Sequence, residues 1–515
     1  MAETDTAVPR LAEALAALSV ATDLAKGQRR ESAMGAALVA CRMARLLGLG
    51  PASQAETFYA ALLRLLGCTS ISVEAGQAAM GQDQNGFYTF SLADWTDPQD
   101  LRRVAEQYFL PAVSQSERSA MIDFVIAHLD AFKDSPGLYC GQAVFLASRL
   151  PVPGRAVDLL HHIEARWDGA LGDAPGEATP VEARILLLAT HATLYFWVGG
   201  AAAAAEFAQS RAGRQFDPAL CNLLEREQDT LFAGFSGGSL LALLLDEEPG
   251  ERRTIDGTAL DTLALTFGQF ADQKTGWYAG HSGRVMSLAA GAAAIAGADT
   301  DDRERLCRAA LTHDIGRVAI PNGLLERANN LGPAEMLEYR QHPFHTEYIL
   351  SLVPGFDAIA RIASSAHERA DGSGYHRGNS RPDWAQAVLA AANRYAELTE
   401  DRPWRDAFEP EAAAALLIER ASQGRQVAEA VSLVLEAAGH GKRFAERAYP
   451  DGLTRREVEV LRCIVQGRTT HSIADRLGIS PKTADHHIQH IYQKTGAHSR
   501  APLALYALKA DIFSE

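Results

Sequence analysis

The stretch Ala309-Ala310-Leu311-Thr312-His313-Asp314-Ile315-Gly316 joins an apolar run directly to an adjacent histidine and aspartate. A neutral imidazole and a carboxylate can bind one divalent metal ion, and a single aspartate can bridge two ions. Further donors follow at long, irregular spacings, namely His281, His342 and His367. A lone histidine on an alanine-rich helix is usually solvated or hydrogen-bonded, but this combination favours a metal centre that holds Fe, Mn or Zn.

The composition predicts a folded, all-α protein of three or four domains. The chain has 515 residues, of which 47% are hydrophobic and 22% charged, as in ordinary globular proteins. Aromatic residues are scarce and runs of Ala, Leu, Arg and Glu recur, which favours helices. The six cysteines form no C-x-x-C pair, and the acidic N-terminus lacks the features of a secretory signal, so we expect reduced thiols in the cytoplasm.

Residues 185–205 carry no charge and are long enough to span a bilayer. They contain His191 and the pair Gly199-Gly200, and no basic cluster flanks them. We therefore predict two buried helices that meet at the glycines, and no membrane association. The net charge of −15 is uneven, because residues 451–515 carry nine Lys or Arg against seven Asp or Glu. Nucleic acid should be repelled by the body of the chain and tolerated by this tail.

Breaks in composition divide the chain into residues 11–237, 255–439 and 452–515. The first two blocks resemble one another at a shift of 249 residues, and the similarities keep their order along the chain. Where the second block has His281 and His313-Asp314, the first has Ser32 and Arg64-Leu65, which cannot form the same metal site. We expect the first block to be a scaffold or a sensory half without catalysis.

Residues 270–410 resemble the HD-GYP subfamily of HD metal-dependent phosphohydrolases. The resemblance rests on the following stretches: Gly280-His281-Ser282, His313-Asp314-Ile315-Gly316, Gln341-His342-Pro343, His367-Glu368 through Gly374-Tyr375, and Asp401-Arg402-Pro403-Trp404-Arg405. The resemblance implies an all-helical domain, a centre of two or three metal ions, and hydrolysis of cyclic di-GMP.

The resemblance also implies roles for individual residues. The implied metal ligands are His281, His313, Asp314, His342, His367 and Asn393. The implied catalytic residues are Asp314 and Arg317, and the implied ligand-binding residues are Arg317, Glu368, Asp371, Gly372, Gly374, Tyr375 and His376. Four positions depart from the family pattern: Ala366 replaces a histidine, Asn393 an aspartate, Arg317 a lysine and His376 a proline.

These departures predict a weakened centre. Replacing a carboxylate by the neutral amide of Asn393 removes a negative ligand and weakens the hold on a dication, so metal occupancy should be sub-stoichiometric. Arg317 can grip a phosphate, yet a permanent cation cannot protonate a leaving group. We weigh slow phosphodiester cleavage against binding of a nucleotide or metal without turnover, and the ligand losses favour binding.

The C-terminal block predicts a helix-turn-helix. Thr454 and Glu457 have the capping-box spacing, a short helix ends at Gly478, and Ser480 with Pro481 begins a third helix. A plain three-helix bundle for protein contact is the alternative. Residues 452–515 resemble the LuxR-type DNA-binding domain, which implies that Lys482, Thr483, His486, His487, His490, Lys494 and Arg500 face double-stranded DNA, and that residues 501–512 pair two copies in a homodimer.

We therefore predict a cytoplasmic transcription regulator in which two tandem HD-type domains control the activity of a LuxR-type DNA-binding domain. One rival is an active phosphodiesterase of cyclic di-GMP whose DNA-binding tail localises it. Another is a structural dimerisation platform without a ligand. The sequence leaves open the ligand, the operator and the sign of regulation.

Overall fold

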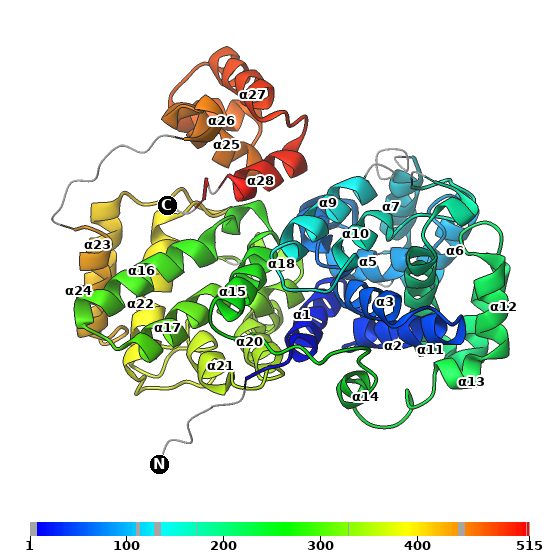
Figure 1. Cartoon of the computed structure of the whole chain (residues 1–515). Coiled ribbons are helices and arrows are strands. Elements are labelled where there is room, and N and C mark those ends of the chain that lie inside the picture. Colours follow the sequence, from blue (N-terminus) through cyan, green and yellow to red (C-terminus); the bar gives the residue numbers. More distant parts are fainter. Residues whose placement is uncertain are drawn as a thin grey trace. The chain divides into compact units, whose positions relative to one another are not determined.

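The computed structural model describes residues 8–109, 114–127, 135–172, 174–327, 329–440, 449–510 and 512–513. Helices and turns make up these ranges, which contain isolated bridges but no strand (Figure 1). The all-α prediction is therefore confirmed. The chain forms two compact units, the first comprising residues 1–263, 321–323 and 349–356 and the second comprising residues 264–320, 324–348 and 357–515.

The first unit is built around α2 and α11, which pack against each other and against α3. Its helices are α1 (Leu11–Ala25), α2 (Ser32–Leu46), α3 (Pro51–Leu63), η1 (Cys68–Ile71), α4 (Ser72–Ala78), α5 (Asp83–Ser91), α6 (Pro98–Tyr108), α7 (Gln115–Ala127), α9 (Ser135–Ala147), α10 (Ala156–Leu159), η2 (Leu160–His162), η3 (Gly176–Ala178), α11 (Val181–Ser210), α12 (Pro218–Arg226), α13 (Gln228–Leu231) and α14 (Leu240–Asp246).

The long helix α11 breaks at Gly199 and Gly200, where the backbone leaves helical geometry. The predicted meeting of two helices at these glycines is confirmed, because glycine tolerates the positive φ of 81° at Gly200. By length and composition, Val181–Ser210 and Pro51–Ala78 are each apolar enough to cross a membrane, and 50% and 72% of their apolar windows are buried inside the protein. Burial of this extent is what core helices of folded domains show.

In the second unit, α16 packs against α17, α22 and α24. The helices of this part of the chain, of which α15, α18 and α20 also contribute residues to the first unit, are α15 (Gly257–Asp272), η4 (Gly276–Tyr278), α16 (His281–Ala296), α17 (Thr300–Thr312), η5 (Ile315–Ala319), α18 (Asn322–Leu325), α19 (Pro333–Tyr339), α20 (His342–Leu350), α21 (Asp357–Ala363), α22 (Trp384–Thr399), α23 (Pro410–Ser422) and α24 (Ala428–Ala437). The C-terminal elements are η6 (Pro450–Gly452), α25 (Arg455–Val465), α26 (Thr470–Leu477), α27 (Pro481–Thr495) and α28 (Arg500–Lys509), orange to red in Figure 1.

The helix pairs α2–α3 and α16–α17 share one register. At the shift of 249 residues, α2 begins where α16 begins and α3 begins where α17 begins. The residues before α2 and α16, Glu31 and Gly280, both adopt left-handed backbone geometry, with φ of 70° and 72°. This agreement of boundaries and turn geometry supports the duplication that the sequence predicts.

A buried aspartate repeats at the same shift. Asp23 accepts the backbone N–H of Ala33 in the first unit, and Asp272 accepts the backbone N–H of Ser282 in the second. Both carboxyls are fully buried. Each one therefore satisfies a donor in the first turn of the following helix, and desolvation raises the pKa of both groups, to about 7 at Asp272.

The His-Asp motif is positioned by close packing at Gly316. A Cβ at this position would lie 2.0 Å from the carbonyl oxygen of His342 and 2.5 Å from the backbone nitrogen of Thr346. The Thr346 hydroxyl accepts the N–H of Gly316 at 3.0 Å and donates to the His313 carbonyl at 2.9 Å. Only glycine therefore allows η5 to lie against the first turn of α20, which brings His342 beside His313 and Asp314.

The C-terminal elements form the predicted helix-turn-helix. Thr454 and Glu457 make the capping box of α25, and Gly478 ends α26 in left-handed geometry with φ of 62°. Ser480 caps α27, and Pro481 is its first residue. These local signals are confirmed because each one acts within a single turn of the chain.

Gly316→Ala should destabilise the second unit by about 1–3 kcal/mol, because the methyl group overpacks the contact with α20. The matched change Gly283→Ala in α16 meets no atom within 4 Å, and it should be neutral or stabilising by about 0.5–1 kcal/mol. Urea unfolding of both variants measures the difference. Equal stability of the two variants would contradict the packing described for Gly316.

Candidate metal centre and DNA-binding surface

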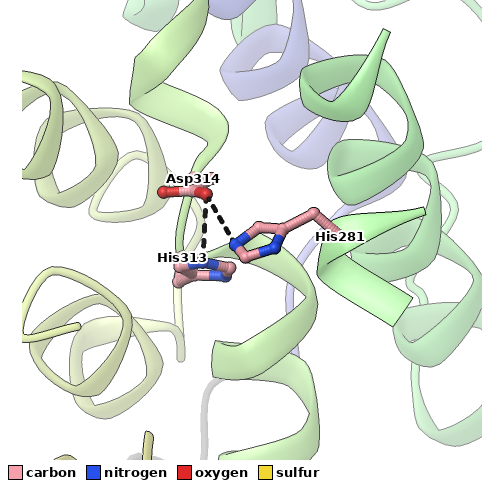
Figure 2. A group of neighbouring side chains, drawn as sticks. All are labelled: His281, His313 and Asp314. Atoms are coloured by element: carbon pink, nitrogen blue, oxygen red, sulfur yellow. Dashed lines mark ion pairs between the residues drawn. The ribbon is translucent and has the colours of Figure 1, made fainter. Parts of the chain in front are cut away.

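The centre of the second unit is the carboxylate of Asp314, which is 2% exposed. Asp314 lies between α17 and η5, so it enters the core directly after the last residues of α17. Its Oδ2 lies 3.0 Å from Nε2 of His313 and 3.4 Å from Nε2 of His281 at the start of α16. Figure 2 shows both imidazoles turned toward this carboxylate.

A second group of donors shares the same carboxylate. Nε2 of His367 lies 3.9 Å from Oδ1 of Asp314. The ring of His342, at the start of α20, packs edge-on against His367 with centroids 4.7 Å apart. Within each group, His281, His313 and Asp314 or Asp314, His342 and His367, the ligand atoms lie within 4.8 Å of one another. The sequence-predicted donors thus converge on two adjacent positions bridged by Asp314.

The histidines are oriented through their other ring nitrogens. Nδ1 of His313 lies 2.8 Å from the Ala310 carbonyl, and Nδ1 of His342 lies 2.7 Å from the Tyr339 carbonyl. A carbonyl oxygen only accepts, so Nδ1 must carry the proton and Nε2 must offer a lone pair. Nε2 of both rings has no hydrogen-bond partner among the described residues. The site therefore fits a divalent metal ion.

His281 is held in a similar way by a residue that sequence reasoning missed. Its Nδ1 lies 2.8 Å from a carboxylate oxygen of Glu400. Glu400 directly precedes the stretch Asp401-Arg402-Pro403-Trp404-Arg405 on which the family resemblance partly rests, and this adjacency was the available signal. A carboxylate behind a ligating imidazole fixes its tautomer and raises its basicity.

Charge in the centre favours an ionised Asp314 and neutral imidazoles at His281 and His342. Burial opposes ionisation of Asp314, but Arg317 and His313 outweigh it and hold the pKa of the carboxyl well below its usual range. Burial, aided by His367 and Arg317, lowers the pKa of His342 well below its usual value. Burial also lowers the pKa of His281 despite the nearby Glu400. At His313 burial is outweighed by the adjacent Asp314, which raises the pKa of the imidazole, so a metal ion must displace a proton more readily held there.

Asn393 contacts the centre without supplying a charge. Its Oδ1 lies 3.1 Å from Nε2 of His281. Because His281 is neutral and protonated at Nδ1, two lone pairs would face each other in this orientation, and the reverse orientation of the amide, with its NH₂ donating to Nε2, fits the hydrogen bonding better. The amide therefore occupies the lone pair that His281 would offer to a metal ion.

Ala366 is buried, and its methyl group has no donor atom. The loss of a metal ligand at Ala366 and at Asn393 stays a prediction.

Arg317 lies inside the centre rather than at its edge. Its Nη1 is 2.6 Å from Oδ2 of Asp314 in an ion pair that lacks hydrogen-bond geometry, and its guanidinium stacks over the Tyr278 ring at 4.2 Å. Glu397 lies 3.7 Å away on the other side. Arg317 therefore supplies a fixed positive charge next to the bridging carboxylate, where it competes with a cation and can attract a phosphate.

The residues of the predicted ligand-binding loop make two kinds of contact: one residue borders the metal centre, and others pair with neighbouring residues. Tyr375 stacks on His367 with centroids 5.1 Å apart, so it borders the metal centre. Glu368 accepts the backbone N–H groups of Arg377 and Asn379, which commits both of its oxygens to holding the loop. His376 pairs with Glu347 at 2.8 Å.

The remaining loop residues are Asp371, Gly372 and Gly374. Asp371 is exposed and accepts from the N–H and hydroxyl of Ser373. Gly372 has a positive φ of 76°, and a Cβ on Gly374 would lie 2.4 Å from the Arg369 nitrogen. These three residues shape the loop, and none is among the donors that converge on Asp314.

The predicted DNA-contacting residues also divide into two groups. Lys482, Thr483 and His486 are exposed on α27, whereas His487 and His490 are half-buried. The Lys494 ammonium pairs with Glu457 at 2.7 Å and donates to the Gly452 carbonyl, and Arg500 donates to the Val465 carbonyl at 3.0 Å. The first turns of α27 are therefore the open surface, while Lys494 and Arg500 stabilise the bundle.

Asn393→Asp should raise the affinity for Mn²⁺ by about tenfold or more, because it adds a negative ligand and removes the amide that occupies His281. Elemental analysis after equilibration with Mn²⁺ measures the bound metal. The control variant Asn222→Asp adds the same negative charge at an exposed position on α12, outside the centre. It should not change the amount of bound metal. His313→Ala and Asp314→Ala should abolish binding; retained metal in these variants would refute the centre.

Two protein families match parts of the chain. The HD domain model matches residues 266–427, and the model of bacterial regulatory proteins of the luxR family matches residues 451–507. A 3'3'-cGAMP-specific phosphodiesterase 3 from Vibrio cholerae serotype O1 is 27% identical over 425 residues, which cover 79% of this chain and 90% of that protein. A cyclic di-GMP phosphodiesterase from Thermotoga maritima is 34% identical over 102 residues, which cover 19% of this chain and 28% of that protein.

The chain is also similar to a transcriptional regulatory protein. The transcriptional regulatory protein FixJ from Azorhizobium caulinodans is 38% identical over 112 residues, which cover 22% of this chain and 47% of that protein. The crystal structure of the V. cholerae cyclic GMP-AMP specific phosphodiesterase V-cGAP3 has a TM-score of 0.59 at 23% identity and covers 84% of this chain and 99% of that one, which shows a shared fold. The chain therefore contains an HD domain homologous to the HD-GYP phosphodiesterases, followed by a C-terminal LuxR-type helix-turn-helix domain.

Proposed function

We propose that this protein is a DNA-binding transcription regulator whose HD domain senses a divalent metal and a cyclic dinucleotide, with weak or no hydrolysis. The LuxR-type domain provides the DNA-binding activity. The donor set around Asp314 supports metal binding, with Fe, Mn or Zn as the fitting ions. The similarity to a protein named as a 3'3'-cGAMP-specific phosphodiesterase supports the ligand class.

One observation carries the regulatory part of the proposal. Glu400, which holds His281 of the metal centre, also accepts from Nε of Arg284 at 2.5 Å. Nη1 of Arg284 donates to the carbonyl of Phe513 at 2.6 Å. Three consecutive polar contacts thus join a candidate metal ligand to the C-terminal end of the DNA-binding domain.

A second set of contacts holds the same domain. Arg476 on α26 pairs with Asp401 at 2.6 Å and also with Asp406. Arg468 pairs with Asp406 at 2.9 Å. Asp401 directly follows Glu400 in the sequence, so a displacement of Glu400 acts on both sets of contacts. Exposed pairs of this kind are individually weak, so small changes at the centre can shift the balance.

The charges explain how metal binding at the centre could affect the DNA-binding domain. A bound dication would draw electron density from His281 and make its Nδ1–H a stronger donor to Glu400. Glu400 then holds Arg284 less firmly, so the Arg284 side chain can change its position against the Phe513 carbonyl. The open first turns of α27, with Lys482 and Thr483, remain available for phosphate and base contacts.

Coupling of this kind predicts a change in DNA affinity. With duplexes selected from a random pool, at fixed salt, Mn²⁺ with 3'3'-cGAMP should shift the Kd of the full chain by about 5–150-fold, the usual range of allosteric coupling. Arg284→Met should abolish most of this shift, whereas Arg305→Met on the exposed face of α17 should preserve it. Fluorescence anisotropy measures each Kd.

By linkage, DNA must change the affinity for the nucleotide by the same factor. An identical Kd with and without metal and nucleotide would refute the sensory role. A shift that persists in Arg284→Met would instead refute the path through Phe513.

The alternative is an active phosphodiesterase with a DNA-binding tail, favoured by similarity along 90% of a named phosphodiesterase. Asn393, Ala366 and the pairing of Arg317 with Asp314 argue against rapid turnover. With Mn²⁺ and either 3'3'-cGAMP or cyclic di-GMP, we expect product formation at most slightly above that of Asp314→Ala, measured by chromatography. Fast hydrolysis that His313→Ala abolishes would establish the alternative.

A homodimer through α28, a cytoplasmic location and the absence of membrane association are parts of the same proposal. Pairing through residues 501–512 rests on the resemblance to the LuxR-type family. The location and the absence of membrane association rest on the burial of half or more of the apolar windows of the two candidate helices.

A further inference from the structure

The first unit encloses a cavity of about 140 Å³, counted as the space open to the centres of water molecules. One water needs about 10–15 Å³ by this measure, so the cavity has room for on the order of ten. Its wall consists mainly of aliphatic and aromatic side chains, with Phe87 and Trp95 among the rings. A cavity of this size and lining accommodates a small organic molecule.

Arg64 is the polar side chain that distinguishes this cavity. It is 3% exposed and lines the wall. Its Nη2 makes a long ion pair with Glu164 at 3.3 Å, while Nε and Nη1 have no hydrogen-bond partner among the described residues. Buried guanidinium groups are normally paired, because an unsatisfied charged donor in an apolar setting is unfavourable. Arg64 therefore has two N–H donors available to an anion.

Lys26 adds a second positive charge to the wall. Its ammonium group lies 5.4 Å from the centroid of the Phe87 ring, and desolvation lowers the pKa of this group. Arg166 also lines the cavity but is already paired with Asp94 and Asp168, each at 2.7 Å. Arg64 and Lys26 thus share the nearby charge of Glu164, whereas Arg166 has two short carboxylate contacts of its own.

Two carboxylates, Glu74 and Glu164, complete the charged part of the wall. Glu164 meets only one of the three nitrogens of Arg64, through the 3.3 Å contact. Among the described residues, Nε and Nη1 of Arg64 keep no protein acceptor, which favours an anion at Arg64 with its apolar part against the rings.

The repeated register gives this cavity a counterpart in the second unit. At the shift of 249 residues, Arg64 and Leu65 stand where His313 and Asp314 stand in the metal centre. Both residues line the cavity. The first unit thus has a cationic donor and an aliphatic side chain where the second has two ligands for a cation. The equivalent position in the first unit therefore attracts an anion rather than a cation.

We propose that the first unit binds a small organic anion, a carboxylate or phosphate monoester on an apolar body, with Arg64 as the anion-binding side chain. The bound group accepts a hydrogen bond from Nε or Nη1 of Arg64, which point to different sides of the guanidinium, and the positive charge of the guanidinium favours a carboxylate or a phosphate. The phenyl-sized remainder lies among the aromatic and aliphatic side chains. This site is independent of the centre at Asp314.

The test uses four probes that share one ring, namely benzoate, phenyl phosphate, benzamide and benzamidinium, titrated calorimetrically into the full chain. At least one anion should bind about tenfold or more tightly than neutral benzamide, because a charge-assisted pair replaces an unsatisfied donor. Whichever anion binds more tightly identifies the group as carboxylate or phosphate. Equal affinity for benzamide, preference for benzamidinium, or no heat with any anion at millimolar concentration would overturn the proposal.

Arg64→Met should remove the preference of the anion over benzamide. Arg226→Met, which removes an arginine that is 66% exposed on α12, should leave it unchanged. If Arg64→Met does not fold, Arg64→Lys keeps the charge and should bind the anion more weakly than the native chain but more tightly than benzamide. An anion preference that survives in a folded Arg64→Met protein would overturn the assignment to Arg64.

Discussion

The carboxylate of Asp314 is buried among three imidazoles and a guanidinium, and the second unit depends on this concentration of charge. Its oxygens lie within 2.6–3.9 Å of His281, His313, His367 and Arg317. An ionised carboxylate survives burial only when such partners offset its lost hydration. The helices that carry these residues must therefore pack in one arrangement, and the close contact at Gly316 fixes two of them.

The same centre carries two side chains that make it less attractive to a dication. Arg317 brings a permanent positive charge to the bridging carboxylate, and Asn393 brings a neutral amide to His281. Both changes make the centre less attractive to a dication while leaving its shape intact. A centre that attracts a dication less strongly is suited to reversible metal binding. The contacts of Glu400 and Arg284 connect this centre to the DNA-binding domain.

The two units show how a shared register of helices can carry side chains of opposite charge. Asp23 and Asp272 satisfy the same backbone position, and the following helices begin in the same register. The difference lies in the side chains that face the interior: Arg64 and a cavity in the first unit, His313 and Asp314 in the second. Fold and function are thus separable, since a framework of helices constrains positions but not the charges placed there.

The sequence by itself determined the helical class, the break at Gly199 and Gly200, the caps of α25 to α27 and the convergence of the His-Asp donors. These features depend on periodicity, glycine geometry and capping, which act within a few residues, or on a motif with a family precedent. Only the tertiary structure decided that Glu400 holds His281, that Lys494 is paired with Glu457, and that Arg64 faces a cavity. These contacts join residues 37 to 119 positions apart or depend on packing around a void, and no local pattern encodes which distant side chain will complete them.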